Sequence, residues 1–260
     1  MNKKSILSSK IIKEKKFEYI DSGEGTPIVL LHGLMGSLSN FKSCIQSLPK
    51  KGYRVILPIL PIYDLPLLKT NARQLSLFVE KFITHLDLAD FFLLGNSLGG
   101  HVGLIYCKNN PNKAKGLILT GSSGLYENAL GGSFPKRGDY NYIKNKTEEV
   151  FYDPKHATKE LVDEVFETIN SRKKLIKILA MAKSAMRHNM KQDLSNIHTP
   201  TCLIWGKNDK ITPPEVAIDF DKLMPNTNLY WLEECGHAPM MEQSQQFNEI
   251  LYNWTEKIKT

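Results

Sequence analysis

The feature that most constrains the fold is an alternation of short apolar runs with longer amphipathic stretches. Short apolar runs bounded by glycine, proline or polar residues are typical of strands buried on both faces. The stretches between them repeat their apolar residues at helical spacing. We therefore predict an α/β fold whose mostly parallel central sheet carries helices on both faces. The predicted strands are residues 27–33, 53–60, 91–96, 115–121, 201–206 and 227–234, after an opening strand or hairpin at 10–21; the predicted helices are 40–49, 71–86, 98–109 and 242–258.

Residues 122–196 break this alternation, because they hold several helical patterns and no convincing strand. The strand pattern resumes afterwards, so we interpret the segment as a helical insertion and not as a separate domain. The core would then consist of residues 1–121 and 197–260. Open α/β sheets bind ligands at the carboxyl ends of their strands, and we expect the insertion to cover that edge. Glycines at its start and a proline after it mark the boundaries: Gly121, Gly124, Gly131, Gly132 and Pro200.

The composition excludes several classes of protein. The chain is 42% hydrophobic and 23% charged, which is an ordinary balance for a soluble globular domain. No apolar run approaches the roughly 18 residues of a membrane span. The start, MNKKSILSSK, lacks the apolar centre of a signal peptide, so we expect a cytoplasmic protein. The four cysteines have no metal-site or disulfide spacing and are predicted to be small core residues: Cys44, Cys107, Cys202 and Cys235.

The formal charge of +7 is concentrated in one part of the chain. Residues 136–191 hold 13 Lys and Arg against 8 Asp and Glu. Acids alternate with the bases there, which favours a solvated helical surface over a basic stripe for nucleic acid. A weak attraction for anionic substrates stays open as an alternative.

A serine stands between two glycines where one predicted strand ends. The segment Gly95-Asn96-Ser97-Leu98-Gly99 matches G-x-S-x-G, after the strand 91–96 and before the helix 98–109. In that context the pattern is typical of a tight turn that lifts a serine hydroxyl clear of the sheet edge. The amides at the start of the helix carry partial positive charge and point towards an oxyanion formed there. We therefore predict that Ser97 is a nucleophile.

A serine hydroxyl needs a base to remove its proton, and the base needs an acid to orient it. His237 follows the strand 227–234, on a loop at the carboxyl edge of the sheet. Asp209 follows the neighbouring strand 201–206 at the same edge. Alone, Asp209 would be an ordinary polar turn residue before a helix start at Thr212-Pro213-Pro214. The order Ser97, Asp209, His237 favours a catalytic triad instead.

Two backbone amides complete the predicted site. One is the amide of Leu98, which follows the nucleophile, and the other comes from the loop after the first buried strand. In that loop Leu34 is the favoured donor, because Gly33 lets the backbone approach the serine closely. We interpret His32 as a structural residue that holds the loop by hydrogen bonds. His101 lies too far along the helix after Ser97 to reach the hydroxyl.

The chain resembles the α/β-hydrolase fold superfamily from about residue 11 to 254. The resemblance rests on five segments in fixed order: PIVLLHGLMG, GYRVILP, LLGNSLGG, PTCLIWGKNDKITP and EECGHAPMMEQ. Within the superfamily the chain is similar to small capped serine esterases and to hydrolases that cleave a carbon–carbon bond of meta-ring-fission products. Two segments depart from the family pattern. Residues 59–64 replace the usual Asp-x-Pro-Gly-x-Gly run, and Ala238 stands where ring-fission-product hydrolases commonly carry tryptophan.

The resemblance implies that the insertion is a cap over a substrate pocket. One predicted helical face of the cap carries Leu175, Leu179, Ala182 and Met186. The methionines, Asn40 and Arg187 also have a plain structural alternative: a methionine can pack cap against core, Asn40 can N-cap the helix 40–49, and an arginine can lie on the surface. The residues expected to line the pocket are Met35, Asn40, Met181, Met186, Arg187 and Ala238.

Together these features predict a carboxylesterase-like serine hydrolase that cleaves a small ester or a related carbonyl compound through an acyl-enzyme. Its partner would be a small-molecule substrate, with no nucleic acid, no metal and no organic cofactor. A second hypothesis keeps the triad but hydrolyses a carbon–carbon bond, with a dienoate under the cap. A third is a catalytically silent receptor that uses the same pocket.

Overall fold

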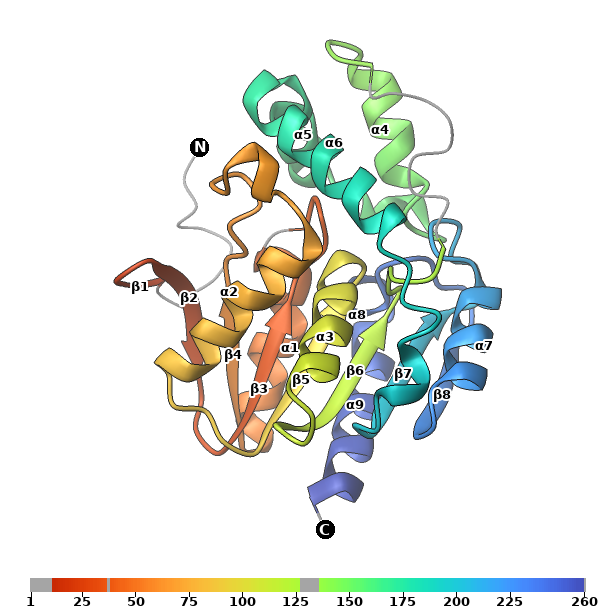
Figure 1. Ribbon diagram of the computed structural model, residues 1–260. Helices are drawn as coiled ribbons and strands as arrows, with labels where there is room; N and C mark the ends of the chain where they lie inside the picture. The colour runs from red at the N-terminus through yellow and green to blue at the C-terminus, as the bar shows by residue number, and fades with distance from the viewer. Residues whose placement is uncertain (1–10, 37, 127–135, 260) are drawn as a thin grey trace.

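An eight-stranded sheet forms the centre of the molecule (Figure 1). The computed structural model describes residues 11–36, 38–126 and 136–259. The strand order is β1-β2-β4-β3-β5-β6-β7-β8, and β2 alone runs against the other described strands. The predicted α/β fold with a mostly parallel sheet is therefore confirmed. The strands are β1 (Ile12–Glu14), β2 (Phe17–Ser22), β3 (Thr26–Leu31), β4 (Tyr53–Pro58), β5 (Phe91–Asn96), β6 (Ala114–Thr120), β7 (Thr201–Gly206) and β8 (Thr227–Leu232).

The helices of the core lie close to where the sequence pattern puts them. The opening hairpin is β1 and β2, and the predicted helices at 71–86 and 98–109 are present. The predicted closing helix, 242–258, is preceded by a separate short helix, Pro239–Glu242. The sequence predicts only the start of the helix that follows Pro213. The core helices are α1 (Lys42–Ser47), α2 (Ala72–His85), α3 (Leu98–Asn109), α7 (Pro214–Leu223), α8 (Pro239–Glu242) and α9 (Ser244–Lys259).

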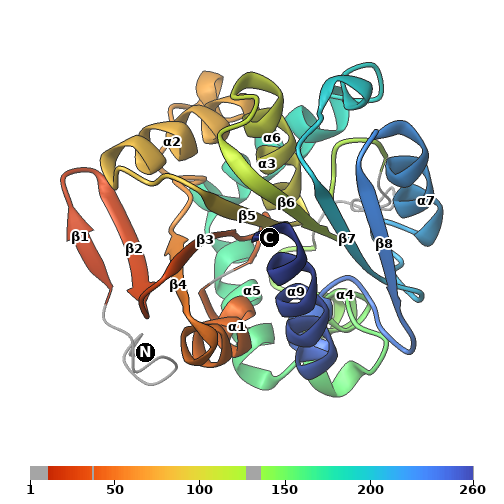
Figure 2. The ribbon, with the colours of Figure 1, turned by 90° about the horizontal axis from the view of Figure 1, so that it is seen from below.

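Successive residues of the central strands face opposite helical layers. In β3, Val29 belongs to the apolar cluster that contains residues of α2, α3 and α7, whereas Leu30 belongs to the cluster with α1 and α9. This alternation follows from the pleat of a strand. Figure 2 shows α2 and α3 on one side of the sheet and α1 and α9 on the other. Because both faces are covered, β5 and β7 are buried along their whole length.

The described residues between β6 and β7 form three further α-helices: α4 (Tyr140–Glu148), α5 (Lys159–Asn170) and α6 (Arg172–Arg187). Asp139 and Thr158 begin α4 and α5, because their side chains accept hydrogen bonds from backbone amides of the first turn. Figure 1 shows the three helices beyond the carboxyl ends of the parallel strands. The described part of residues 122–196 contains no strand. Gly131 and Gly132 lie outside the described residues.

All four cysteines are buried, as predicted for core residues. No helix within the described ranges is both long and apolar enough to cross a membrane. The N-terminal segment that was assessed as a signal sequence, residues 1–10, lies outside those ranges.

Candidate active site

The backbone at Ser97 has a conformation that residues other than glycine rarely adopt. Its φ is 55° and its ψ is −120°, between the end of β5 and the start of α3. The turn requires glycine on both sides. A Cβ on Gly95 would lie 2.4 Å from backbone atoms of Gly99 and Gly100, and one on Gly99 would lie 2.1 Å from the carbonyl oxygen of Leu31. Strained backbone of this kind, at about 1–3 kcal/mol, clusters at functional sites because the surrounding structure must hold it in place.

Asn96 ties the serine turn to the loop that carries His237. Its side chain is buried, and Nδ2 donates to the carbonyl oxygens of Thr120 at 3.0 Å and of His237 at 3.1 Å. The Ser97 amide donates to the same Thr120 oxygen at 3.1 Å. No role is predicted for Asn96 from the sequence alone. The available signal was a single polar residue at the end of an otherwise apolar strand.

His237 and Asp209 form a hydrogen-bonded pair near the serine turn. They lie on the loops after β8 and β7, which are neighbours in the sheet. The Nδ1–H of His237 donates to Oδ2 of Asp209 at 2.9 Å, and both residues are buried. An ionised carboxylate only accepts hydrogen bonds, so this contact puts the ring proton on Nδ1. The lone pair is then on Nε2, as a general base requires.

Three more hydrogen bonds hold the Asp209 carboxylate. Its Oδ1 accepts from the amides of Ile211 at 2.8 Å and Thr212 at 2.9 Å, and its Oδ2 accepts from the Thr212 hydroxyl at 2.8 Å. Thr212 is fully buried. The sequence predicts Thr212 only as part of a helix start. Its contact with the acid depends on how the loop folds back, which the local pattern does not reveal.

The loop after β3 approaches Ser97 closely. A Cβ on Gly33 would lie 3.3 Å from the Cβ of Ser97, so a side chain at Gly33 would crowd the serine. His32 fixes the loop from behind: its Nδ1 donates to the Gly33 carbonyl at 2.9 Å, and its Nε2 accepts from the Leu60 amide at 3.0 Å. Burial lowers the pKa of His32, which keeps the ring neutral. The structural role predicted for His32 agrees with these contacts.

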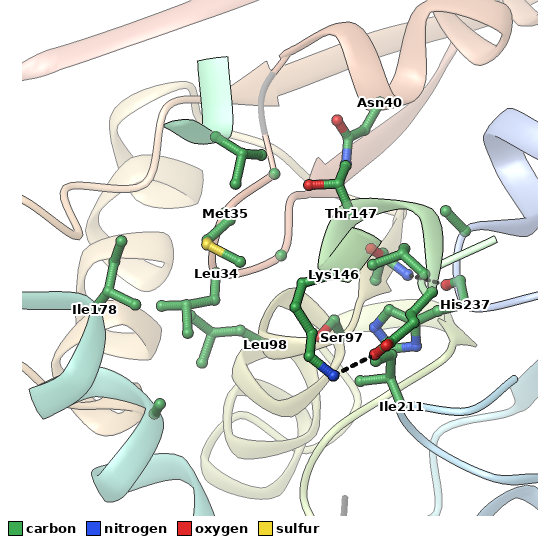
Figure 3. Close-up of a pocket in the computed structure, with 18 of the residues that line it drawn as sticks. Leu34, Met35, Asn40, Ser97, Leu98, Lys146, Thr147, Ile178, Ile211 and His237 are labelled. Carbon is green, nitrogen blue, oxygen red and sulfur yellow. Dashed lines mark hydrogen bonds and ion pairs between the residues drawn. The ribbon is translucent and has the colours of Figure 1, made fainter. Parts of the chain in front are cut away.

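A cavity of about 320 Å³ lies in front of Ser97 and His237 (Figure 3). Its volume is near the lower end of the range for small-molecule sites, about 300–1,000 Å³. Asn40 lines it from a short 3₁₀ turn, Leu38–Phe41. The N-cap alternative for Asn40 is wrong, because α1 begins after Phe41 and has no side-chain cap. The cavity is also lined by these predicted residues: Leu34, Met35, Leu98, Met181 and Ala238.

Two predicted pocket residues do not line this cavity. The Met186 side chain is 45% exposed, and Arg187 lines a separate surface depression beside the start of α2. The reason is the rotation of α6 about its axis. The face expected to be apolar pairs Ala182 with Met186, but the cavity-lining residues of α6 are Ile178, Met181, Ala182 and Ala185. The predicted apolar face therefore lies on the correct helix, but it is displaced by about one residue from the face that lines the cavity.

Helix α4 contributes polar residues that the sequence analysis missed. Tyr142, Lys146 and Thr147 line the cavity together with Glu149, the residue that follows the helix. The Lys146 amine pairs with the Glu149 carboxylate at 2.7 Å, and this pair is the dashed line in Figure 3. In the sequence these residues have the pattern of a solvated helix with alternating charges. Their position at the cavity follows only from the tertiary packing of α4.

His101 pairs with another histidine and not with the serine. Its Nε2 lies 2.9 Å from Nδ1 of His188, the residue that follows α6. Burial, with a smaller effect from His188, lowers the pKa of His101 to about 3. The expectation that His101 lies outside the serine machinery agrees with this contact.

A model of the alpha/beta hydrolase fold family matches residues 26–244, most of the chain. The chain belongs to this family. It is 45% identical to an alpha/beta hydrolase enzyme from the metagenome of sediments from the lagoon of Mar Chica, Morocco, with a TM-score of 0.80 over 96% of this chain and 100% of that one.

Two curated relatives from Pseudomonas putida also match this member of the alpha/beta hydrolase fold family. The dihydrolipoyllysine-residue acetyltransferase component of an acetoin cleaving system is 29% identical over 90% of the chain, which spans 64% of that relative's length. A 2-hydroxy-6-oxononadienedioate/2-hydroxy-6-oxononatrienedioate hydrolase is 25% identical over 93% of this chain and 92% of the relative.

Proposed function

We propose that the chain is a serine hydrolase that cleaves a small ester or a related carbonyl substrate. The observation that carries the proposal is the hydrogen bond from His237 to Asp209 beside the strained turn at Ser97. All three residues come from loops at the carboxyl edge of the sheet, and Ser97 and His237 line one cavity. A buried Asp–His pair beside a half-buried serine that lines a cavity is the arrangement that activates a serine hydroxyl.

In the first half of the reaction, Ser97 Oγ attacks the substrate carbonyl and its proton passes to Nε2 of His237. Asp209 keeps Nδ1 protonated and balances the charge of the imidazolium. The tetrahedral oxyanion is stabilised by the amides of Leu34 and Leu98. Leu98 is the first residue of α3, so its amide has no acceptor within the helix. One such donor contributes about 3–4 kcal/mol in enzymes where it has been removed.

In the second half, His237 gives its proton to the leaving alcohol and the acyl group stays on Ser97. Water then enters, His237 takes one of its protons, and the hydroxide attacks the acyl-enzyme. Collapse of the second tetrahedral species releases the acid and returns the proton to Ser97. This sequence needs no metal and no organic cofactor.

The helical segment 122–196 has the role of a cap in this proposal. Its helices α4, α5 and α6 supply cavity-lining residues, and the core supplies the nucleophile and the base. The cap would therefore decide which small molecules reach Ser97. Most of the cap residues that line the cavity are apolar, which suits a short hydrocarbon chain.

A fluorophosphonate probe tests the proposal directly, because it reacts with activated serines. We expect labelling of the wild-type protein at Ser97 and hydrolysis of short 4-nitrophenyl esters. Ser97→Ala should abolish both while the folded structure, measured by circular dichroism and thermal unfolding, is kept. Absence of labelling in folded wild-type protein would instead favour a catalytically silent receptor.

A second candidate keeps the triad and hydrolyses a carbon–carbon bond. It is favoured by the match along almost the whole chain to a hydrolase of 2-hydroxy-6-oxononadienedioate. Incubation with such a dienedioate and with a short 4-nitrophenyl ester separates the two candidates. Turnover of the dienedioate with negligible ester hydrolysis would replace the first candidate by the second.

A further inference from the structure

We propose that Lys146 recognises an anionic group on the substrate, so that the cavity selects carboxylate-bearing esters, such as half-esters of dicarboxylic acids. This inference rests on the proposed function of the Ser97 site. The described residues that line the cavity include two lysines, Lys146 and Lys210, and one acidic residue, Glu149. The rest of the lining is mostly apolar. A ligand that matches it has a short apolar chain and one negative charge.

Helix geometry directs Lys146 towards the cavity. Ile143, Lys146 and Thr147 all line it, and their spacing of three and four residues places them on one face of α4. Ile143 and Thr147 are buried on that face, which fixes its orientation. In Figure 3 the Lys146 side chain points into the part of the cavity where Ser97 and His237 are drawn.

The pairing of Lys146 with Glu149 does not prevent this role. The two side chains are 46% and 47% exposed, and ion pairs this exposed contribute little net stability. A substrate carboxylate that enters the cavity can therefore replace Glu149 at the amine. The hydrogen bond that the Lys146 amine donates to Glu149 raises the pKa of Lys146, so the amine is cationic at neutral pH. Glu149 thus holds the charge in place and would compete with the substrate for it.

Lys144 supplies a matched control on the same helix. It also forms an ion pair, to Glu148 at 3.4 Å, and its side chain is 50% exposed. Lys144 does not line the cavity. Removing either amine changes the net charge of the protein by the same amount. A difference between the two variants therefore reports on position and not on long-range electrostatics.

The test compares mono(4-nitrophenyl) adipate with its methyl ester, which differ in one negative charge. The quantity measured is the ratio of kcat/KM for the anionic ester to kcat/KM for the neutral ester, each corrected for spontaneous hydrolysis. Lys146→Met should lower this ratio about tenfold, the scale of one hydrogen bond between charged groups. Lys146→Arg should keep most of it, Glu149→Gln should raise it, and Lys144→Met should leave both constants unchanged. An unaltered ratio in Lys146→Met overturns the inference.

A binding measurement separates this inference from the proposed function. In the Ser97→Ala variant, calorimetry with monomethyl adipate and dimethyl adipate measures anion preference without turnover. If binding of the monoanion is about tenfold weaker once Lys146→Met is added, the anion site is supported even where no ester is hydrolysed. If the monoanion binds no better than the diester with Lys146 present, the anion site is refuted, whatever the catalytic result.

Discussion

Thr212 donates its hydroxyl hydrogen to the same carboxylate oxygen of Asp209 that accepts from His237. The two bonds are 2.8 Å and 2.9 Å long, and all three residues are buried. The hydroxyl therefore fixes the position of the oxygen that orients the imidazole. Thr212 also anchors its own loop, because its carbonyl accepts from the indole nitrogen of Trp205 at 2.8 Å. The Thr212 hydroxyl oxygen also lies 3.2 Å from Nδ1 of His237. Thr212 therefore acts on the proposed base through Asp209 and by its own contact with the ring, and it is a positioning residue.

Replacing Thr212 tests this positioning role. Thr212→Val keeps the shape of the side chain and removes the hydroxyl, so Asp209 Oδ2 keeps His237 as its hydrogen-bond donor. Loss of one such bond, worth about 1 kcal/mol, should lower kcat/KM for a 4-nitrophenyl ester about fivefold. Thr212→Ser retains the donor and should stay within about twofold of wild type. Equal activity in the valine and wild-type proteins would show that the hydroxyl does not position the acid.

Asp209→Asn should be far more damaging. The amides of Ile211 and Thr212 donate to one carboxylate oxygen, so the asparagine must keep its carbonyl oxygen there and turn its NH₂ towards His237. His237 Nδ1 would then have to accept, and Nε2 would carry the proton that a general base must not have. We expect a loss of about 10³–10⁴-fold in kcat, measured by ester hydrolysis, with a similar thermal unfolding midpoint. Retention of a tenth of the activity would contradict the assignment of the acid.

The strands and the serine turn could be predicted because their signals are local. An apolar run such as FFLLGN reports burial on both faces, and G-x-S-x-G reports a turn that only glycine can flank. The cavity wall could not be predicted in the same way. Ala182 lies on both the expected and the observed apolar face of α6. Apolar spacing alone therefore could not distinguish two rotations of the helix that differ by about one residue. The roles of Asn96, Thr212 and Lys146 depend on contacts with distant segments.

The distance between Gly33 and Ser97 leads to a prediction about the oxyanion donor. Gly33→Ala would put a methyl group 3.3 Å from the Ser97 Cβ and 3.4 Å from Asn96 Oδ1, so the loop must shift slightly. If the Leu34 amide stabilises the oxyanion, that shift should lower kcat about tenfold, because catalysis is sensitive to small misplacements.

The control is Gly52→Ala, far from the site. Gly52 has a φ of 84° and open space around it, so its variant should lose stability and keep kcat. An unchanged kcat in Gly33→Ala would exclude the loop as a donor.

The pair formed by buried His101 and half-buried His188 predicts how stability depends on pH. Burial, and then the charge of His188, lowers the pKa of His101 to about 3, whereas a histidine in the unfolded chain titrates near 6.5. Below pH 6.5 the unfolded state therefore binds a proton that folded His101 does not. The free energy of unfolding should fall as the pH falls, by about 2 kcal/mol between pH 7 and pH 5 from this residue.

His101→Gln should remove that part of the slope, measured by urea unfolding at a series of pH values. Some slope will remain, because the pKa values of His32 and His188 are also lowered, in each case mainly by burial. The exposed His198 provides the control: His198→Gln should retain the wild-type slope. Parallel curves for His101→Gln and wild type would show that His101 is protonated as readily in the folded protein as in the unfolded chain. The pair with His188 would then have to accommodate a charge, and its 2.9 Å contact would be a charged hydrogen bond.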